Sequence, residues 1–472
     1  MKALTALGPL VFPAAGAIVI LLLDAFRQRK SKSPLAVLSL AWLAGSAVLS
    51  AGLWGRDASA FGGLLRLDDA AILAGLLVLG SASFAVLLGW RWIQRLDAAF
   101  GEFYGLILLA SAGLMIMIQT RDLLVVFLGL EVFSVSAYGL TGLKRNDDRA
   151  AEAAVKYFLT GSFAAAFMVF GLAVLFGLSG SFDISAAAAC LGSGPAAWLG
   201  FALFTVGLAY KLALVPFHMW APDVYEGAPT PISGFFAVAP KVAAFLVLFR
   251  LAVSMPREVW TGGPGFLFLS AVSAASLIIG NLAGLRQANL KRMLAYSGIS
   301  HAGTMLIAVL AGDASSLLFY LAAYLFMGLG AFAALTAMSR TGREFVRLDE
   351  LAGAGFRYPW IGAVFTILLL SLAGFPPTGG FLAKWLVFSA GVRAGLVPLV
   401  VLGVVTSLIA AAYYLRVIVA LYMREPAAGV EVEAGNAPAW LVLFLGLVGT
   451  LLLGIFPGGI LRLIRQAAAS IF

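Results

Sequence analysis

Long uninterrupted runs of apolar residues, separated by short polar loops, form the main pattern of this chain. A run of about 20 apolar residues can cross the hydrocarbon core of a bilayer as an α-helix. The runs show no apolar–polar alternation, so membrane-spanning strands are not favoured. About fourteen spans are predicted, at 7–26, 34–54, 69–90, 104–119, 122–143, 152–177, 196–220, 231–253, 265–285, 292–311, 315–339, 358–388, 397–422 and 438–461. The expected fold class is an all-α polytopic membrane protein, with residues 1–472 forming a single membrane domain.

Prolines interrupt two of these spans at corresponding places. Pro216 lies within the seventh span, and Pro376 and Pro377 lie within the twelfth. Proline removes a helical hydrogen bond, so helices 7 and 12 are expected to be broken. The breaks are five predicted helices apart, and an odd-numbered unit that is repeated once must return with inverted topology. The pattern predicts two inverted five-helix repeats, at 104–253 and 265–422; ordinary proline kinks without a repeat are the alternative.

Composition supports the membrane class and excludes several others. The chain is 62% hydrophobic and 11% charged, whereas soluble domains have about 25% charged residues. One cysteine, Cys190, and two histidines, His218 and His301, are too few for an intrachain disulfide, an iron–sulfur cluster or a structural zinc site. Neither common glycine-rich nucleotide-binding motif occurs in the sequence. The chain is therefore not expected to bind nucleotides or to carry a redox centre.

The positive charges indicate topology. The net charge of +9 is distributed over short loops, so it does not indicate nucleic-acid binding. Most loop lysines and arginines follow the first, third, fifth, ninth, eleventh and thirteenth spans. The positive-inside rule places these loops in the cytoplasm. Both termini are then predicted on the opposite side, which fits an even number of spans.

Four charged residues lie deep within apolar spans: Glu131, Lys211, Lys241 and Lys384. A charge at the centre of a membrane helix costs about 2.5–3.5 kcal/mol on insertion scales. A chain that keeps several such charges is expected to use them, and their usual use is the movement of ions or protons. A structural hydrogen bond from a protonated Glu131 and permanent ion pairs of the lysines are the alternatives.

The surroundings of these charges suggest how they could act. Ser134 and Tyr138 follow Glu131 on one helical face. Opposite charges stabilise one another, so the charge on Lys211 would depend on how close Glu131 lies. A lysine of this kind can load and release a proton as its partner moves. The span that carries Lys384 has no acidic residue, so any partner of Lys384 must come from another helix.

Four further residues are candidates for a supporting role. His218 lies at the first break and His301 lies in the middle of the tenth span. Histidine titrates near neutral pH and can relay protons, although a lone buried histidine is as often a satisfied core residue. Lys156 and Lys291 lie closer to the predicted cytoplasmic ends of their spans, where anchoring at the membrane interface is the alternative.

Several motifs resemble those of the antiporter-like membrane subunits of respiratory complex I, the proton-pumping NADH–quinone oxidoreductase. Residues 214–231, with the segment M-W-A-P-D-V-Y-E-G-A-P-T-P, look like the signature of that family. Residues 289–297, the break at 374–377, Glu131 and Lys156 match the same family. The similarity covers residues 100–425 and is greatest to the N-type subunits. The L-type differs by a long C-terminal extension, and the M-type by a glutamate at the position of Lys384.

The resemblance implies an inverted-repeat fold and a proton channel through a central chain of buried residues. It implies that Glu131 and Lys211 form the coupled pair, that Lys241 is the central relay and Lys384 the lysine on the exit side, and that His218, Lys291 and His301 assist.

The resemblance also implies partners and a location. The chain would be a non-redox subunit of a translocase of the EC 7.1.1 type in the bacterial inner membrane. NADH, FMN, iron–sulfur clusters and quinone would be bound elsewhere in the parent complex, and none in this chain. Its partners would be other membrane subunits of the complex, the lipid bilayer and protons, with no nucleic acid. A subunit of a multisubunit sodium/proton antiporter and a purely structural membrane subunit are the alternatives.

Overall fold

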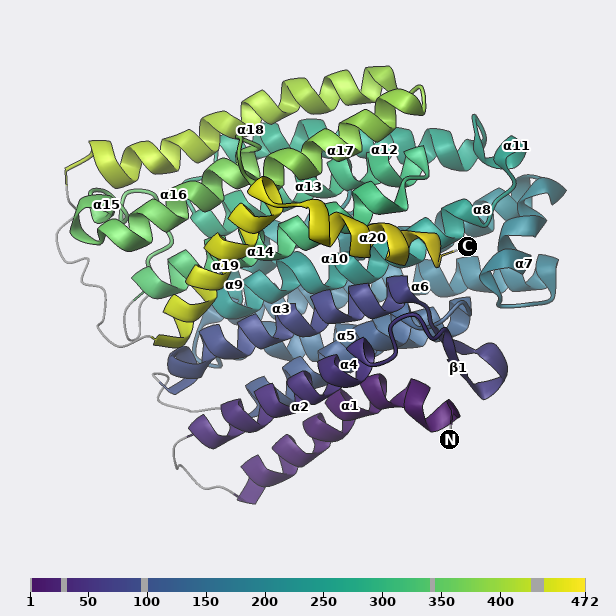
Figure 1. Ribbon diagram of the computed structural model, residues 1–472, viewed down its shortest axis with the longest axis horizontal. Helices are drawn as coiled ribbons and strands as arrows, with labels where there is room; N and C mark the ends of the chain where they lie inside the picture. Colours follow the sequence, from purple (N-terminus) through teal and green to yellow (C-terminus); the bar gives the residue numbers. More distant parts are fainter. Residues whose placement is uncertain (1, 27–31, 95–100, 340–343, 426–436, 472) are drawn as a thin grey trace.

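The computed structural model describes residues 2–26, 32–94, 101–339, 344–425 and 437–471. Its long helices lie side by side, with α1 and α2 at one edge, α10 and α14 in the middle and α18 at the other edge (Figure 1). The elements are α1 (Lys2–Phe26), α2 (Ser33–Ala51), β1 (Ala58–Ala60), η1 (Phe61–Gly63), β2 (Leu65–Leu67), α3 (Asp69–Gln94), α4 (Glu102–Ile118), α5 (Leu123–Thr141), α6 (Asp148–Ser179), α7 (Ile184–Ala189), η2 (Cys190–Ser193), α8 (Pro195–Leu212), α9 (Trp220–Gly227), α10 (Thr230–Val253), α11 (Arg257–Trp260), α12 (Pro264–Leu285), α13 (Leu290–Ala311), α14 (Ala314–Met338), α15 (Ala354–Arg357), α16 (Pro359–Ala373), α17 (Gly379–Arg393), α18 (Val397–Met423), α19 (Ala437–Ile455) and α20 (Gly458–Ala469).

The helical membrane architecture is confirmed. Within the described residues, 12 helices are long and apolar enough to cross a membrane. Two predicted spans have shorter counterparts: α4 has 17 residues, and the predicted span 358–388 consists of α16 and α17, with 15 residues each. The small antiparallel hairpin of β1 and β2 and the C-terminal helix α20 were not predicted from the sequence. The exact number of spans stays a prediction.

Three helices form the enclosed centre of the molecule. The apolar window of α10 is buried along its whole length, and those of α14 and α13 are nearly so. These three helices pack against one another. By contrast, only 33% of the apolar window is buried in each of α1, α2 and α6, so their outer surfaces face lipid or another protein. The central helices carry Lys241 and His301, which places both side chains away from lipid.

Polar residues define where several helices begin. The side chains of Asp122, Asp147 and Asn289 accept backbone N–H groups at the first turns of α5, α6 and α13. The N–H groups of a first helical turn have no partner within the helix, so these caps stabilise the helix starts. Gly180 and Gly312 end α6 and α13 in the left-handed conformation, which glycine adopts without steric cost.

Both predicted breaks are present. The first separates α8 from α9, and its Val215–Pro216 peptide bond is cis. The Val215 N–H group donates to Ser276 Oγ of α12 at 3.0 Å. The second break separates α16 from α17, where the Gly380 N–H group donates to Ser371 Oγ at 3.1 Å. Side-chain oxygens thus supply partners that the helical ladder lacks at each break. The repeat boundaries at 104–253 and 265–422 stay a prediction.

Charged residues mark the two ends of the bundle. Lys144, Lys291 and Glu344 meet at the end where α5 finishes and α13 begins. Arg250 and Asp68 pair at the opposite end, where α10 finishes and α3 begins. Parts of several loops used for the topology prediction, at 27–31, 95–100, 340–343 and 426–436, lie outside the described residues. Which end faces the cytoplasm stays a prediction.

Candidate functional site

The structure places the three mid-span lysines inside the protein. Lys211 of α8, Lys241 of α10 and Lys384 of α17 are 4%, 2% and 8% exposed. None of the three forms an ion pair within the described part of the chain. Permanent structural ion pairs, the alternative considered from the sequence, are therefore not found for these lysines.

Lys211 lies in the last turn of α8, directly before the first break. Its Nζ atom lies 5.0–5.5 Å from the ring centres of Phe133, Tyr138, Tyr157 and Tyr210. No hydrogen-bond partner of Nζ is found among the described residues. Aromatic faces attract an ammonium group without fixing its direction, and the C-terminal end of a helix attracts it as well. The side chain is therefore held by diffuse electrostatics and not by a single ligand.

Glu131 is the carboxylate that acts on Lys211. It lies half-buried on α5, the helix that also supplies Phe133 and Tyr138. The two charges interact electrostatically, yet the described residues contain no direct ion pair between them. Because the two groups are not in direct contact, the strength of their interaction depends on small movements of α5 or α8.

Lys241 occupies the middle of α10. Its Nζ atom donates to the Ala237 carbonyl oxygen at 3.1 Å and lies 5.8 Å from the ring centre of Tyr324. Pro240 precedes it within the helix. The ammonium group is therefore held by one backbone carbonyl of its own helix.

Lys384 reaches across the second break. Its Nζ atom donates to the Ala373 carbonyl oxygen at 2.8 Å, and Ala373 is the last residue of α16. The partner is a backbone carbonyl and not a carboxylate, and it lies in the same predicted span, 358–388, which the break divides into α16 and α17. Lys211 and Lys384 share one arrangement, because each lies against the C-terminal end of an interrupted helix.

His301 of α13 lies between two tyrosine hydroxyl groups, one on each ring nitrogen. Its Nδ1 atom lies 2.7 Å from the Tyr320 hydroxyl, and its Nε2 atom lies 3.4 Å from the Tyr414 hydroxyl. The electrostatic fields of both Lys241 and Lys384 act on the ring. A histidine with a hydroxyl on each nitrogen is suited to pass a proton along a hydrogen-bonded chain.

His218 lies within the first break and is half-buried. Its Nδ1 atom is shielded from solvent and has no hydrogen-bond partner among the described residues. The two histidines thus have different settings: among the described residues, His301 has a side-chain hydroxyl group on each ring nitrogen, whereas His218 Nδ1 has no partner.

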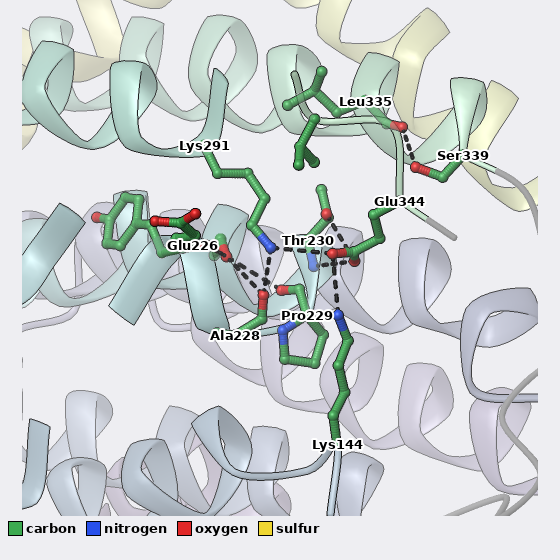
Figure 2. Close-up of polar contacts among 12 residues, drawn as sticks. Lys144, Glu226, Ala228, Pro229, Thr230, Lys291, Leu335, Ser339 and Glu344 are labelled. Atoms are coloured by element: carbon green, nitrogen blue, oxygen red, sulfur yellow. Dashed lines mark hydrogen bonds and ion pairs between the residues drawn. The ribbon is translucent and has the colours of Figure 1, made fainter. Parts of the chain in front are cut away.

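Lys291 binds a residue that the sequence analysis missed. Its Nζ atom donates to the Ala228 carbonyl oxygen at 2.6 Å and to Glu344 Oε2 at 3.1 Å. Lys144 donates to the same Oε2 atom at 3.1 Å, and Thr230 donates its N–H and hydroxyl groups to Oε1 (Figure 2). Burial alone would raise the pKa of Glu344, but the two lysines and the Thr230 bonds hold it well below its ordinary value.

Lys156 is the candidate that lies at the surface. Its side chain is 47% exposed and forms ion pairs with Glu152 at 2.7 Å and Asp223 at 2.9 Å. Arg292 joins Asp223 to Glu226 in the same cluster. Lys156 therefore lies outside the set of buried lysines.

Of the groups that surround the buried lysines, the sequence pattern distinguished Tyr138 but not Glu344, Phe133, Tyr157 or Tyr210. Glu344 lies in a loop with other charged residues, and its partners Lys144 and Lys291 are far from it in sequence. The rings around Lys211 come from three helices, α5, α6 and α8. Only the tertiary fold brings these groups together.

The fold and the site define a class of protein. Buried titratable side chains beside interrupted membrane helices are typical of proteins that move ions or protons across a bilayer. The described residues contain no cluster of His, Cys, Asp and Glu that could hold a metal ion.

Comparisons with known proteins identify the family. Residues 120–410 match the family model described as "NADH:quinone oxidoreductase/Mrp antiporter, TM". The chain is 38% identical to NADH-quinone oxidoreductase subunit N 1 of Solibacter usitatus (strain Ellin6076), over 99% of this chain and 98% of that protein. The chain belongs to the NADH:quinone oxidoreductase/Mrp antiporter family of membrane proteins.

Solved structures agree with this assignment. A chain of respiratory complex I from Thermus thermophilus is 35% identical and superposes with a TM-score of 0.83, covering 96% of this chain and 98% of that one. A chain of the Mrp complex from Dietzia sp. DQ12-45-1b has a TM-score of 0.84, covering 99% of this chain and 97% of that one. The Dietzia chain is 22% identical and shares the fold alone.

Proposed function

We propose that this chain is the N-type proton-translocating membrane subunit of a bacterial NADH–quinone oxidoreductase. The name of the Solibacter relative and the similarity to a chain of complex I support this proposal. The setting of Lys211 is the observation that supports proton translocation. Lys211 is a buried lysine at a helix break, near a carboxylate and without a fixed partner among the described residues. A lysine in that setting can exchange a proton when the neighbouring charge moves.

The proposed path follows the buried residues across the molecule. Glu131 controls the charge on Lys211, Lys241 receives the proton, and His301 passes it to Lys384 on the exit side. The Tyr320 and Tyr414 hydroxyls on His301 and the electrostatic link from His301 to both lysines support the second half of this path. Lys291 and His218 assist at the uptake side and at the first break, and Lys156 lies at the outer edge of the uptake side. The two halves of the path lie in the proposed inverted repeats, 104–253 and 265–422.

Electron transfer takes place in other subunits under this proposal. The single cysteine and two histidines of this chain cannot ligate an iron–sulfur cluster. NADH, FMN, iron–sulfur clusters and quinone are therefore assigned to the rest of the complex, which reduces quinone and shifts charge near this chain. The partners are the neighbouring membrane subunits, lipid and protons. We place the chain in the bacterial inner membrane with both termini on the non-cytoplasmic side, as the loop charges indicate.

The test is NADH-driven proton uptake into inverted membrane vesicles that contain the complete complex. Lys211→Ala is expected to lower the uptake rate by about 100-fold or more, the effect typical of losing a proton-transfer group, at equal assembly of the complex. Arg393→Ala is the matched control, because Arg393 is an exposed cation paired with Asp313 away from the buried lysines. Normal pumping with both Lys211 and Lys241 neutralised would falsify the proposal. If Lys211→Ala abolished sodium-driven proton exchange and left NADH-driven uptake unchanged, the chain would be an antiporter subunit.

A further inference from the structure

Glu344 joins two lysines that differ in their access to solvent. Lys144 and Lys291 approach the carboxylate from different sides in Figure 2, and both donate to Oε2 at 3.1 Å. The side chain of Lys144 is 19% exposed, whereas that of Lys291 is 1% exposed. A single oxygen atom therefore connects a partly exposed ammonium group with one that is enclosed in protein.

The cluster also joins three helices of the proposed path. Lys144 follows α5, which carries Glu131, and Thr230 begins α10, which carries Lys241. Lys291 lies in the first turn of α13, which carries His301. Thr230 fixes the other carboxylate oxygen, Oε1, through two hydrogen bonds of 2.9 Å. Glu344 thus contacts residues at the ends of α5, α10 and α13, the helices that carry Glu131, Lys241 and His301.

The backbone places Glu344 independently of its carboxylate. The Leu290 N–H group donates to the Val346 carbonyl oxygen at 2.7 Å, and the Leu348 N–H group donates to the Ala288 carbonyl oxygen at 3.0 Å. These bonds fasten the loop to the beginning of α13. A substitution at Glu344 that keeps the backbone therefore tests the carboxylate and leaves the loop in place.

The cluster can lose one lysine proton without leaving Glu344 unpaired. One carboxylate faces two ammonium groups, so it keeps one ionic partner when either lysine becomes neutral. The other carboxylate whose field acts on Lys291 is Glu226, and Glu226 is already bound by Arg292 at 3.0 Å. Loss of one proton therefore does not leave an unpaired buried carboxylate, which would be strongly unfavourable.

We propose that Glu344 relays protons during uptake, holding Lys144 and Lys291 on one oxygen atom so that they exchange a proton through it. This inference rests on the proposed function. When Lys291 has given its proton to the path, a proton passes from the Lys144 ammonium group through Oε2 to the neutral Lys291 amine. Lys144 is then reprotonated from solvent, and Glu344 stays ionised before and after the exchange.

The test uses the complete complex with Glu344→Gln, Glu344→Asp and the control Asp349→Asn. Asp349 lies in the same segment, is 65% exposed and pairs only with Arg347 among the described residues. Glu344→Gln is expected to slow NADH-driven proton uptake by about tenfold at equal assembly, because a proton-transfer step loses its geometry. The pH profile of uptake is expected to shift towards acid by about one pH unit, since each ammonium group loses its counter-charge. Glu344→Asp is expected to restore most of the rate, and Asp349→Asn to change neither rate nor profile.

Two outcomes would overturn the inference. If Glu344→Gln lowers the amount of assembled complex while the rate and pH profile per complex stay native, the carboxylate only fastens the structure. If Glu344→Asp is as slow as Glu344→Gln, holding the two lysines on a carboxylate is not what matters. Lys211→Ala, measured in the same vesicles, separates this failure from failure of the proposed function. Lost pumping in Lys211→Ala with native pumping in Glu344→Gln rejects the role of Glu344 alone.

Discussion

Arg250 and Lys211 are two buried cations with opposite surroundings. Arg250 is 2% exposed, and its Nη2 atom donates to both oxygens of Asp68 at 2.7 and 2.6 Å. Its Nη1 atom donates to the Ile118 carbonyl oxygen at 2.6 Å. Lys211 is buried to a similar degree, yet aromatic rings surround it and no hydrogen-bond partner is found in the described chain.

The difference separates a buried charge with fixed ligands from one without a fixed partner among the described residues. Arginine stays protonated in proteins and its planar group suits a fixed, two-point contact with a carboxylate. Lysine gives up a proton more readily when it is buried, and it rotates freely about its stem. Arg250 is therefore suited to tie α10 to the segment before α3, whereas Lys211 is suited to gain and lose a proton. Burial is common to both residues, and the ligands distinguish them.

Arg250→Met should have the largest effect on stability. Removing one partner of a buried ion pair leaves Asp68 as an uncompensated charge, which costs about 3–5 kcal/mol. The expected result is a marked loss of assembled complex and a lower melting temperature, measured by gel analysis of membranes and by thermal unfolding. The double variant Arg250→Met with Asp68→Leu should recover much of the loss, because no buried charge remains. Native abundance and melting of the single variant would show that the pair has no structural role.

The sequence revealed the buried lysines more readily than the groups that contact them. Lys211, Lys241 and Lys384 stood out because a charge inside an apolar span is costly, and Pro216 and Pro376 indicated the breaks because proline cannot continue a helical ladder. Both signals are local in sequence.

The contacts of those charges depend on tertiary structure and could not be predicted in the same way. Lys384 binds the Ala373 carbonyl oxygen only because two helix fragments meet at the break. Glu344 meets Lys144 and Lys291 only because its loop runs along the beginning of α13. The aromatic side chains around Lys211 belong to different helices, and their spacing follows ordinary core packing. For the same reason, the pair formed by Arg250 and Asp68 could not be recognised before the ends of α10 and α3 were known to meet.

Gly374→Ala tests whether the position of Lys384, which donates to a single backbone carbonyl, limits proton uptake. Gly374 has a φ of 94°, and a Cβ atom there would lie 2.9 Å from Lys384 Cδ. The substitution is expected to strain the backbone by about 1–3 kcal/mol. It should also slow proton uptake by about tenfold, because displacing a transferring group by a fraction of an ångström is costly.

A matched glycine separates the two effects of Gly374→Ala. Gly395 has a φ of 79°, and no heavy atom lies within 4 Å of the position of an added Cβ. Gly395→Ala should therefore bring similar backbone strain but leave uptake per assembled complex unchanged. Equal slowing in both variants would mean that strain, and not the place of Lys384, limits pumping.

Lys156→Ala should have the smallest effect and tests whether burial is the property that matters. Lys156 and Lys291 both lie near the same end of the bundle, but Lys156 is exposed and held by Glu152 and Asp223, while Lys291 is enclosed. Ion pairs at the surface contribute little and are screened by salt. Uptake by Lys156→Ala is therefore expected to stay within about twofold of the native rate, with any difference shrinking as salt rises, whereas Lys291→Ala in the same vesicles should be much slower. If Lys156→Ala stops pumping as completely as Lys211→Ala, the exposed cluster belongs to the proton path, and burial does not separate the residues that move protons from those that do not.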